Sequence, residues 1–152
     1  MHIYWTGETG IRIEIKNSDE TVVLLVDPYV PENGPQPRSI KADLVLYSNG
    51  EKNSVTITGE PFVMTTPGEI ETKNILVFGV PGPMNEKKNE QVMWFFEAEG
   101  VSLAHIGASV KELSDKQLKI LSSADVLFVP VGGGNFPDAE EAAKIVTQIE
   151  PR

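Results

Sequence analysis

A short polar loop carries the residues of this sequence that are most able to do chemistry. It follows the apolar segment Leu44–Tyr47 and reads Ser48-Asn49-Gly50-Glu51-Lys52-Asn53-Ser54. One carboxylate with neighbouring amide and hydroxyl oxygens is a donor set suited to a hard cation such as calcium or magnesium. The loop has no histidine, so it lacks the imidazole ligands that zinc prefers. Because Asn-Gly pairs favour tight turns for steric reasons, we interpret Asn49-Gly50 as a turn and Glu51 as a solvated charge.

The chain as a whole is poor in ligands for transition metals. Its 152 residues include two histidines and no cysteine. A two-zinc hydrolytic site needs about five or more side-chain ligands, and a one-zinc site needs about three and a water. We expect His2 to lie at a frayed terminus and His105 to be a structural histidine at a strand end. The sequence therefore predicts no zinc, iron or manganese site and no cofactor, and we can assemble no Ser-His-Asp or Cys-His arrangement from it.

Three further segments have both a structural and a functional interpretation. Asp27, which precedes a proline, is expected to cap backbone amides of a loop, and the alternative is a carboxylate that orients a metal ligand. Glu8, between two glycines, either lines a polar pocket or faces solvent, and the sequence does not separate these alternatives. The glycine-rich segment 131–138 lacks the Lys-Ser/Thr of a phosphate loop, and Asp138 would repel an anion, so we interpret it as a strand-to-helix turn.

The elements that must position these residues are mostly strands. Ile11–Lys16 alternates strictly, as a half-buried strand does, and it leads through a turn into Thr21–Val26, which is apolar on both faces like a central strand. Capping-box patterns predict helices over Ser114–Leu121 and Ala139–Ile149. The proline-rich segment 29–38 is expected to be a loop. The remaining predicted strands are Leu44–Tyr47, Ser54–Thr58, Phe62–Thr65, Ile75–Phe78, Val92–Glu97, Val101–His105 and Val126–Val131.

Composition and charge exclude several classes of protein. The hydrophobic fraction is 40% and the charged fraction 23%, which are typical of a globular protein, and the length suits a single domain over residues 1–152. The net charge of −9 disfavours nucleic acid and anionic membranes as partners. No apolar run approaches the roughly 20 residues that span a bilayer. With no cysteine and no signal peptide at the N-terminus, we expect a cytoplasmic protein.

Strands followed by a strand-helix-strand-helix order predict a strand-rich α/β layered domain, and six short segments connect this order with a known family. The order resembles that of the metallo-β-lactamase fold, in particular its compact branch of uncharacterised metal-dependent hydrolases similar to L-ascorbate-6-phosphate lactonase. The resemblance covers essentially the whole chain and implies an αββα layered sandwich. The six segments are a turn in Tyr4–Gly10, an apolar strand ending in Asp27-Pro28, the ligand loop in Leu46–Ser54, a Pro67-Gly68-Glu69 turn, His105–Ala108 and Val129–Gly133.

The same resemblance implies that the family's metal ligands have been replaced in this chain. The loop histidines and aspartate of the family fall on Asn49, Glu51, Asn53 and Ser54, and the bridging aspartate falls on Ala108. Only the carboxylate among these replacements could bind a hard cation well. We therefore expect a vestigial pocket without catalytic or metal-binding residues, and its members are Glu8, Asp27, Asn49, Glu51, Asn53, Ser54, Met84, His105 and Ala108.

Two functions remain open from the sequence. The first is a silent member of the family that serves as a binding or assembly module, and the second is a divergent hydrolase that uses Glu8, Asp27, Glu51 and His105 around a hard metal. Family members continue past the last helix with a further strand, and this chain ends where that strand would begin. We therefore expect a sandwich without its final strand and a homodimer formed through the open edge at Val126–Val131.

Overall fold

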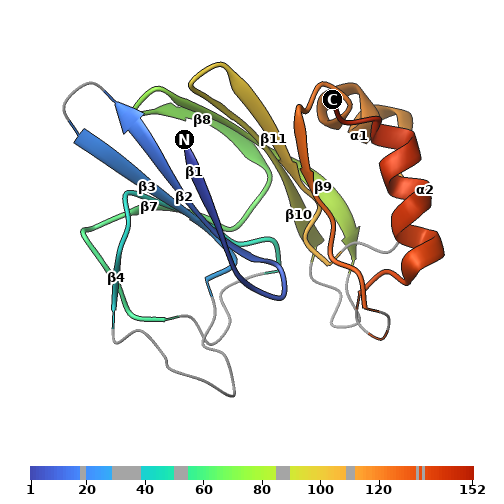
Figure 1. Ribbon diagram of the computed structural model, residues 1–152, viewed down its shortest axis with the longest axis horizontal. Helices are drawn as coiled ribbons and strands as arrows, with labels where there is room; N and C mark the ends of the chain where they lie inside the picture. Colours follow the sequence, from blue (N-terminus) through green and yellow to red (C-terminus); the bar gives the residue numbers. More distant parts are fainter. Residues whose placement is uncertain are drawn as a thin grey trace.

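Two β-sheets packed face to face form the centre of the protein, and two helices lie on one side of them (Figure 1). A computed structural model describes residues 1–17, 20–28, 39–49, 55–84, 90–108, 112–132, 134 and 136–152. The observed architecture is the strand-rich, layered α/β sandwich that the sequence predicts.

The first sheet has the strand order β1-β2-β3-β5-β7. Strands β1, β2 and β3 pair antiparallel, whereas β3, β5 and β7 run parallel to one another. Because parallel strands end at the same edge of a sheet, the residues that follow β3 and β5 lie next to each other. The bounds are β1 His2–Gly7, β2 Gly10–Asn17, β3 Glu20–Val26, β5 Leu44–Leu46 and β7 Phe62–Met64.

The second sheet has the strand order β12-β11-β10-β9-β8. Strands β8 to β11 form an antiparallel meander, and β12 is added parallel to β11. The edge strands of the two sheets are therefore β1 and β7 in the first sheet and β8 and β12 in the second. The bounds are β8 Gly68–Thr72, β9 Ile75–Met84, β10 Glu90–Ala98, β11 Val101–His105 and β12 Val126–Phe128.

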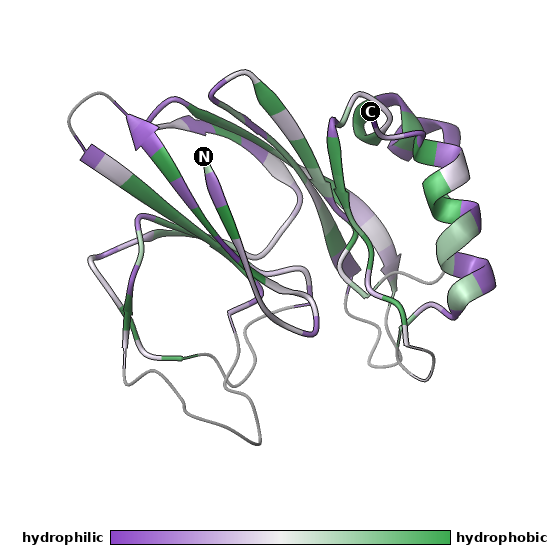
Figure 2. Ribbon diagram, viewed as in Figure 1, coloured by the Kyte–Doolittle hydropathy of each residue, from purple (hydrophilic) through white to green (hydrophobic). Residues whose placement is uncertain are grey.

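The main core lies between the two sheets. Hydrophobic segments are concentrated in the strands of both sheets in Figure 2, and the alternation of β2 places Ile11, Ile13 and Ile15 on the face that meets the second sheet. Trp94 and Phe96 of β10 lie in the same core and have no exposed surface. The burial of these side chains is the main force that holds the sheets together.

Each outer face of the sandwich has its own cover. Helices α1 (Asp115–Leu121) and α2 (Ala139–Ile149) pack on the second sheet through a separate apolar cluster that includes Leu121, Ile145 and Ile149. Both helices begin with the predicted capping boxes. The first sheet is covered by a small parallel pair, β4 (Ile40–Lys41) and β6 (Ile57–Thr58), and Leu25 of β3 packs beneath it. Strand β3 is thus apolar on both faces, as predicted. In the described part of the chain neither helix has the length and hydrophobicity needed to cross a membrane.

The structure differs from the sequence-based expectations in several places. β4 was not predicted, and the strand predicted over Ser54–Thr58 begins only at Ile57. His2 does not fray but opens β1, and Gly68 with Glu69 opens β8 instead of forming a turn. Strand β9 continues to Met84, well past its predicted end. Strand β12 stops at Phe128 and is half the predicted length, because Pro130 follows and a proline has no N–H to donate to a ladder. The predicted loop 29–38 lies outside the described residues.

Candidate functional site

The ends of four strands meet at one end of the sandwich and form the candidate site. Asp27 follows β3 and Ser48 closely follows β5, while His105 ends β11. Val92 of β10 donates its N–H to the backbone oxygen of Ser48 at 2.8 Å, so the two sheets are joined directly at this point. This is the region in which the resemblance places the family's ligands.

Asp27 and Ser48 form a closed pair of hydrogen bonds. The backbone N–H of Ser48 donates to Asp27 Oδ1 at 2.6 Å, and the Ser48 hydroxyl donates to Asp27 Oδ2. Asp27 has a left-handed backbone, with φ of 45°, and its own N–H donates to the oxygen of Leu46 at 2.9 Å. Asp27 thus accepts from one backbone amide, as its predicted capping role requires, and each carboxylate oxygen has a donor.

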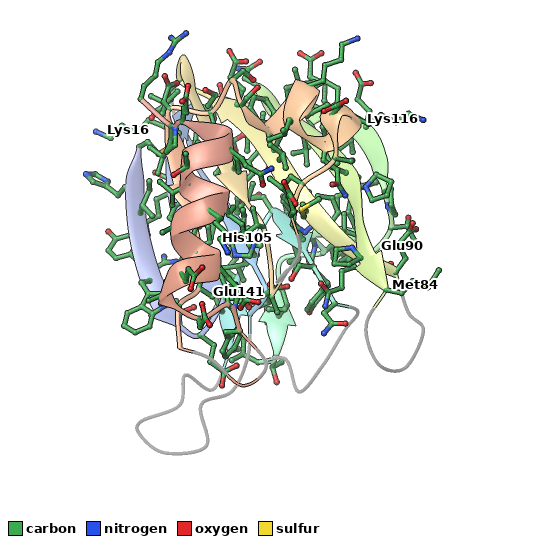
Figure 3. The ribbon with its side chains drawn as sticks, turned by 90° about the vertical axis from the view of Figure 1, so that its right-hand side faces the viewer. Lys16, Met84, Glu90, His105, Lys116 and Glu141 are labelled. Carbon is green, nitrogen blue, oxygen red and sulfur yellow. The ribbon has the colours of Figure 1, made fainter. Side chains whose placement is uncertain are left out.

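His105 is buried and connects the β1–β2 turn with the second sheet. In Figure 3 it lies in the interior behind α2, and its side chain is only 2% exposed. Nε2 lies 2.7 Å from the carbonyl oxygen of Thr9, which can only accept, so Nε2 carries the proton and donates. Nδ1 accepts from the N–H of Gly107 at 3.2 Å. Both ring nitrogens are therefore engaged, as expected for a histidine that serves the fold.

Two glycines allow the segments of the site to approach closely. A Cβ at Gly107 would lie 2.8 Å from the Cβ and Oγ atoms of Ser48, and φ at Gly107 is +60°, where a side chain is strained. A Cβ at Gly10 would lie 3.1 Å from the backbone oxygen of Asp27. Ala108 follows Gly107 directly, and Thr9 precedes Gly10. The β1–β2 turn and the ends of β3, β5 and β11 are thus in direct contact.

The remaining predicted site residues are only partly placed. Glu8 is exposed in the β1–β2 turn, with φ of 47°, and its backbone oxygen accepts from Trp5 Nε1 at 3.0 Å. Met84 is 65% exposed and lies at the end of β9 in Figure 3, well away from His105. Asn49 is half-buried beside Ser48. The residues outside the described part of the chain are Glu51, Asn53 and Ser54.

Sequence reasoning did not assign Ser48 and Gly107, although both are central to the packing of the site. One signal for Ser48 was available. Ser48 follows β5 and Asp27 follows β3, and residues that follow neighbouring parallel strands meet at the same edge of the sheet. No local pattern could have indicated Gly107, because its partner lies far away in the sequence.

The two histidines of the chain lie too far apart to share a metal. His2 opens β1, and Gly7 closes it beside the turn that contacts His105. A strand rises by about 3.3 Å per residue, so the five steps from His2 to Gly7 span about 16 Å. Within residues 1–17, 20–28, 39–49, 55–84, 90–108, 112–132, 134 and 136–152, no group of three or more His, Cys, Asp or Glu side chains could hold a metal ion. A site rich in imidazole does not fit this chain.

The two-sheet sandwich with helices on one side indicates a class of protein, and a comparison with protein-family models identifies the family. A family model described as a beta-lactamase superfamily domain matches residues 2–152. The chain therefore belongs to the β-lactamase superfamily. No match was found among the curated proteins.

Three solved structures with a similar fold are described as hydrolases that depend on or contain a metal. A protein from Thermotoga maritima, proposed to be a Zn-dependent hydrolase of the metallo-β-lactamase superfamily, is 24% identical with a TM-score of 0.79, over 99% of this chain and 71% of that one. A metallo hydrolase from Ignicoccus hospitalis is 13% identical with a TM-score of 0.70, over 98% and 78% of the two chains. A proposed metal-dependent hydrolase from Parabacteroides distasonis is 16% identical with a TM-score of 0.69, again over 98% and 78%. These likenesses show the fold.

Proposed function

We propose that this chain is a metallo-β-lactamase-fold protein that has lost its metal ligands, and that it acts as a binding or assembly module without catalysis. The observation that carries the proposal is the separation of its histidines. One imidazole lies at the far end of β1 and the other is buried with both nitrogens engaged. A zinc or iron hydrolase needs several such ligands at one place.

The contacts of Asp27 support the same proposal. Each oxygen of Asp27 accepts a hydrogen bond from Ser48, so the carboxylate is held toward Ser48. Ala108, where the resemblance places the bridging aspartate, has no donor atom in its side chain. The strand ends that form the family's site are therefore held by contacts within the protein.

Elemental analysis of protein purified without chelator tests the proposal. We expect well below one equivalent of zinc, iron or manganese per chain, and no rise in melting temperature when these metals are added, because a ligand that binds only the folded state would raise it. Close to one tightly bound transition metal per chain would overturn the proposal.

A restored variant provides the positive control for this measurement. Changing the aligned positions back to the ligands that the resemblance implies should give a protein that binds zinc, provided that the scaffold has kept its shape. Metal retained by the variant but not by the natural chain would show that the missing side chains, and not the assay, explain the result. The substitutions are Asn49→His, Glu51→His, Asn53→Asp, Ser54→His and Ala108→Asp.

A divergent hydrolase that uses Glu8, Asp27, Glu51 and His105 around a hard metal is the second candidate. The names of the similar structures favour it, because all three are described as hydrolases. Magnesium or calcium would then protect the chain against thermal unfolding, and Glu51→Gln would remove that protection. Equal melting temperatures with magnesium, calcium or EDTA would exclude this candidate.

A further inference from the structure

Strand β1 is an unusually exposed edge of the first sheet. Ile3, Tyr4 and Trp5 are 41%, 45% and 76% exposed, and no described strand lies beyond them. Soluble proteins commonly protect such edges with lysine, proline or an inward charge. β1 reads His-Ile-Tyr-Trp-Thr-Gly and contains none of these protective residues. Its backbone groups and its apolar side chains are thus available to another strand.

The side chains of this edge are already held in place. Trp5 donates its indole N–H to the backbone oxygen of Glu8 at 3.0 Å. The Tyr4 hydroxyl donates to the Glu14 carboxylate at 3.4 Å, and the Arg12 guanidinium lies 5.5 Å from the centre of the Tyr4 ring. A surface whose side chains are ordered before association loses less conformational entropy when a partner binds.

We propose that β1 is a homodimer interface, at which two copies of this chain pair antiparallel over residues 2–6 about a two-fold axis at Tyr4. The regular pairing of β1 with β2 covers His2–Trp5 and shifts between Trp5 and Gly7, so an axis at Tyr4 keeps the opposed residues Ile3 and Trp5 within the regular part. Tyr4 is the central residue of the segment 2–6. A two-fold axis perpendicular to the sheet keeps the same face of both copies on the same side. Because alternate residues point to opposite faces, two residues that lie opposite each other must then both have odd numbers or both have even numbers.

In this register the exposed side chains cover one another. Ile3 and Trp5 lie on the face that β1 shares with Ile11 and Ile13 of β2, their direct partners. Across the two-fold axis Ile3 of one copy lies opposite Trp5 of the other, and the same pair occurs twice. Aromatic side chains opposite β-branched ones form favourable cross-strand pairs. This self-complementarity favours a second copy of the chain over an unrelated partner.

The charge distribution also favours contact between two copies at β1. The chain carries a net charge of −9, so two copies repel each other over most of their surface. β1 has no Asp, Glu, Lys or Arg, and a two-fold axis at Tyr4 places His2 opposite Thr6, so pairing here brings no like charges directly opposite each other. The remaining repulsion acts at longer range and is screened by salt. The dimer should therefore become tighter, not weaker, as the ionic strength rises.

The other sheet edges are poorer candidates. β12, where the sequence placed the dimer edge, has only the residues Val126–Phe128, and all three are half-buried. β7 has three residues, Phe62–Met64, and lies at the opposite edge of the first sheet. Val63 of β7 is 42% exposed, which matches Ile3 and makes it the control position.

Sedimentation velocity from about 1 to about 200 µM protein tests the interface, a range that covers typical weak dimers. We expect the natural chain to change from monomer to dimer in this range. Ile3→Lys should weaken the dimer at least about tenfold, whereas Val63→Lys should leave it unchanged. A natural chain that stays monomeric, or equal effects of the two variants, would overturn the proposal. Circular dichroism at low concentration verifies that each variant is folded.

Two further measurements report on the interface itself. Trp94 has no exposed surface, so a change of tryptophan emission with concentration reports burial of Trp5. The chain has no cysteine, so Tyr4→Cys places a single thiol at the two-fold axis. Mild oxidation should give a covalent dimer of this variant but not of Val63→Cys. Equal cross-linking of both variants would contradict the register. These outcomes do not depend on metal binding, so the dimer and the proposed function fail separately.

Discussion

The Asp27–Ser48 pair offers the sharpest test of a structural role for the candidate site. Ser48→Ala removes the hydroxyl donor and leaves Asp27 Oδ2 without its partner, although the backbone bond to Oδ1 remains. A hydrogen bond to a charged group contributes about 1.5–3 kcal/mol, and the half-buried setting of Asp27 favours the lower part of this range. We expect a loss of about 2 kcal/mol, which corresponds to a fall of about 4–8 °C in melting temperature for a chain of this size.

A double-mutant cycle isolates the hydrogen bond between the two side chains. Asp27→Ala removes both acceptors and adds backbone strain at φ of 45°, so it should cost about 4 kcal/mol. The strain is present in the double variant as well and therefore cancels in the cycle. We expect the double variant to lose about 2 kcal/mol less than the sum of the single losses.

Urea unfolding measures the cycle, with unchanged m values as the condition for comparing the variants. Each measurement should be made in EDTA and again with added zinc or magnesium. Coupling that is the same in both conditions supports a pair that holds the fold. Single losses that add within about 0.5 kcal/mol, or coupling that appears only with metal, would refute our reasoning about Asp27.

Three other predictions concern stability. Glu51→Ala should change the free energy of unfolding by no more than about 0.5 kcal/mol, as at a typical surface site. A loss several times larger in urea unfolding would indicate a buried, paired carboxylate and would favour the hydrolase candidate. His105→Phe keeps the ring but removes both hydrogen bonds, so it should cost about 2–4 kcal/mol in the same assay, and a neutral result would contradict the structural role. Partial burial raises the pKa of Asp43, but hydrogen bonds from Lys73 and from the backbone N–H of Val23 outweigh it, so its pKa lies below the ordinary 3.8. The stability that this lowered pKa contributes is present above pH 3.8 and is lost as the pH falls through the pKa of Asp43 in the folded protein. The difference in unfolding free energy between the natural chain and Lys73→Met should therefore shrink on acidification. A difference that grows would contradict the pairing of Lys73 with Asp43.

Where burial imposes a pattern, the sequence predicts the fold well. The strict alternation of Ile11–Lys16 identifies β2 because every second side chain enters the core. The helix starts at Ser114 and Asp138 are also recovered, because a capping box is a local interaction that needs no tertiary partner.

The missed strands lack such a pattern for physical reasons. β1 is exposed along almost its whole length, so neither face is required to be apolar. The sequence predicts that β9 ends at Phe78, because a glycine and a proline follow and such residues normally indicate a turn. In the structure Gly79 remains in the strand, since a Cβ there would lie 2.7 Å from the Trp94 ring. The glycine makes room for the tryptophan and does not end the strand.

The candidate site is less predictable than the fold, because its contacts join distant segments. The resemblance indicated which strand ends converge, and the hydrogen bonds of Asp27 and His105 agree with their structural interpretation. The partners of these residues could not be predicted, since Ser48 meets Gly107 and His105 meets Thr9 only after both sheets have formed. Such pairs depend on register and on close backbone approach, and neither leaves a local signal.

The contacts of His105 agree with the proposal that this buried histidine serves the fold and not a metal. An imidazole binds a metal through a nitrogen lone pair, and here Nδ1 uses its lone pair to accept from Gly107 while Nε2 donates its proton to Thr9. Binding a metal would break at least one of these bonds and leave a buried partner unsatisfied, at a cost of about 1–3 kcal/mol. In a zinc site several ligands together repay such costs, but the second histidine lies at the far end of β1, about 16 Å from the turn. The ring is therefore more stable as a link between the β1–β2 turn and β11, and the contacts that make it necessary for the fold are those that keep it from acting as a ligand.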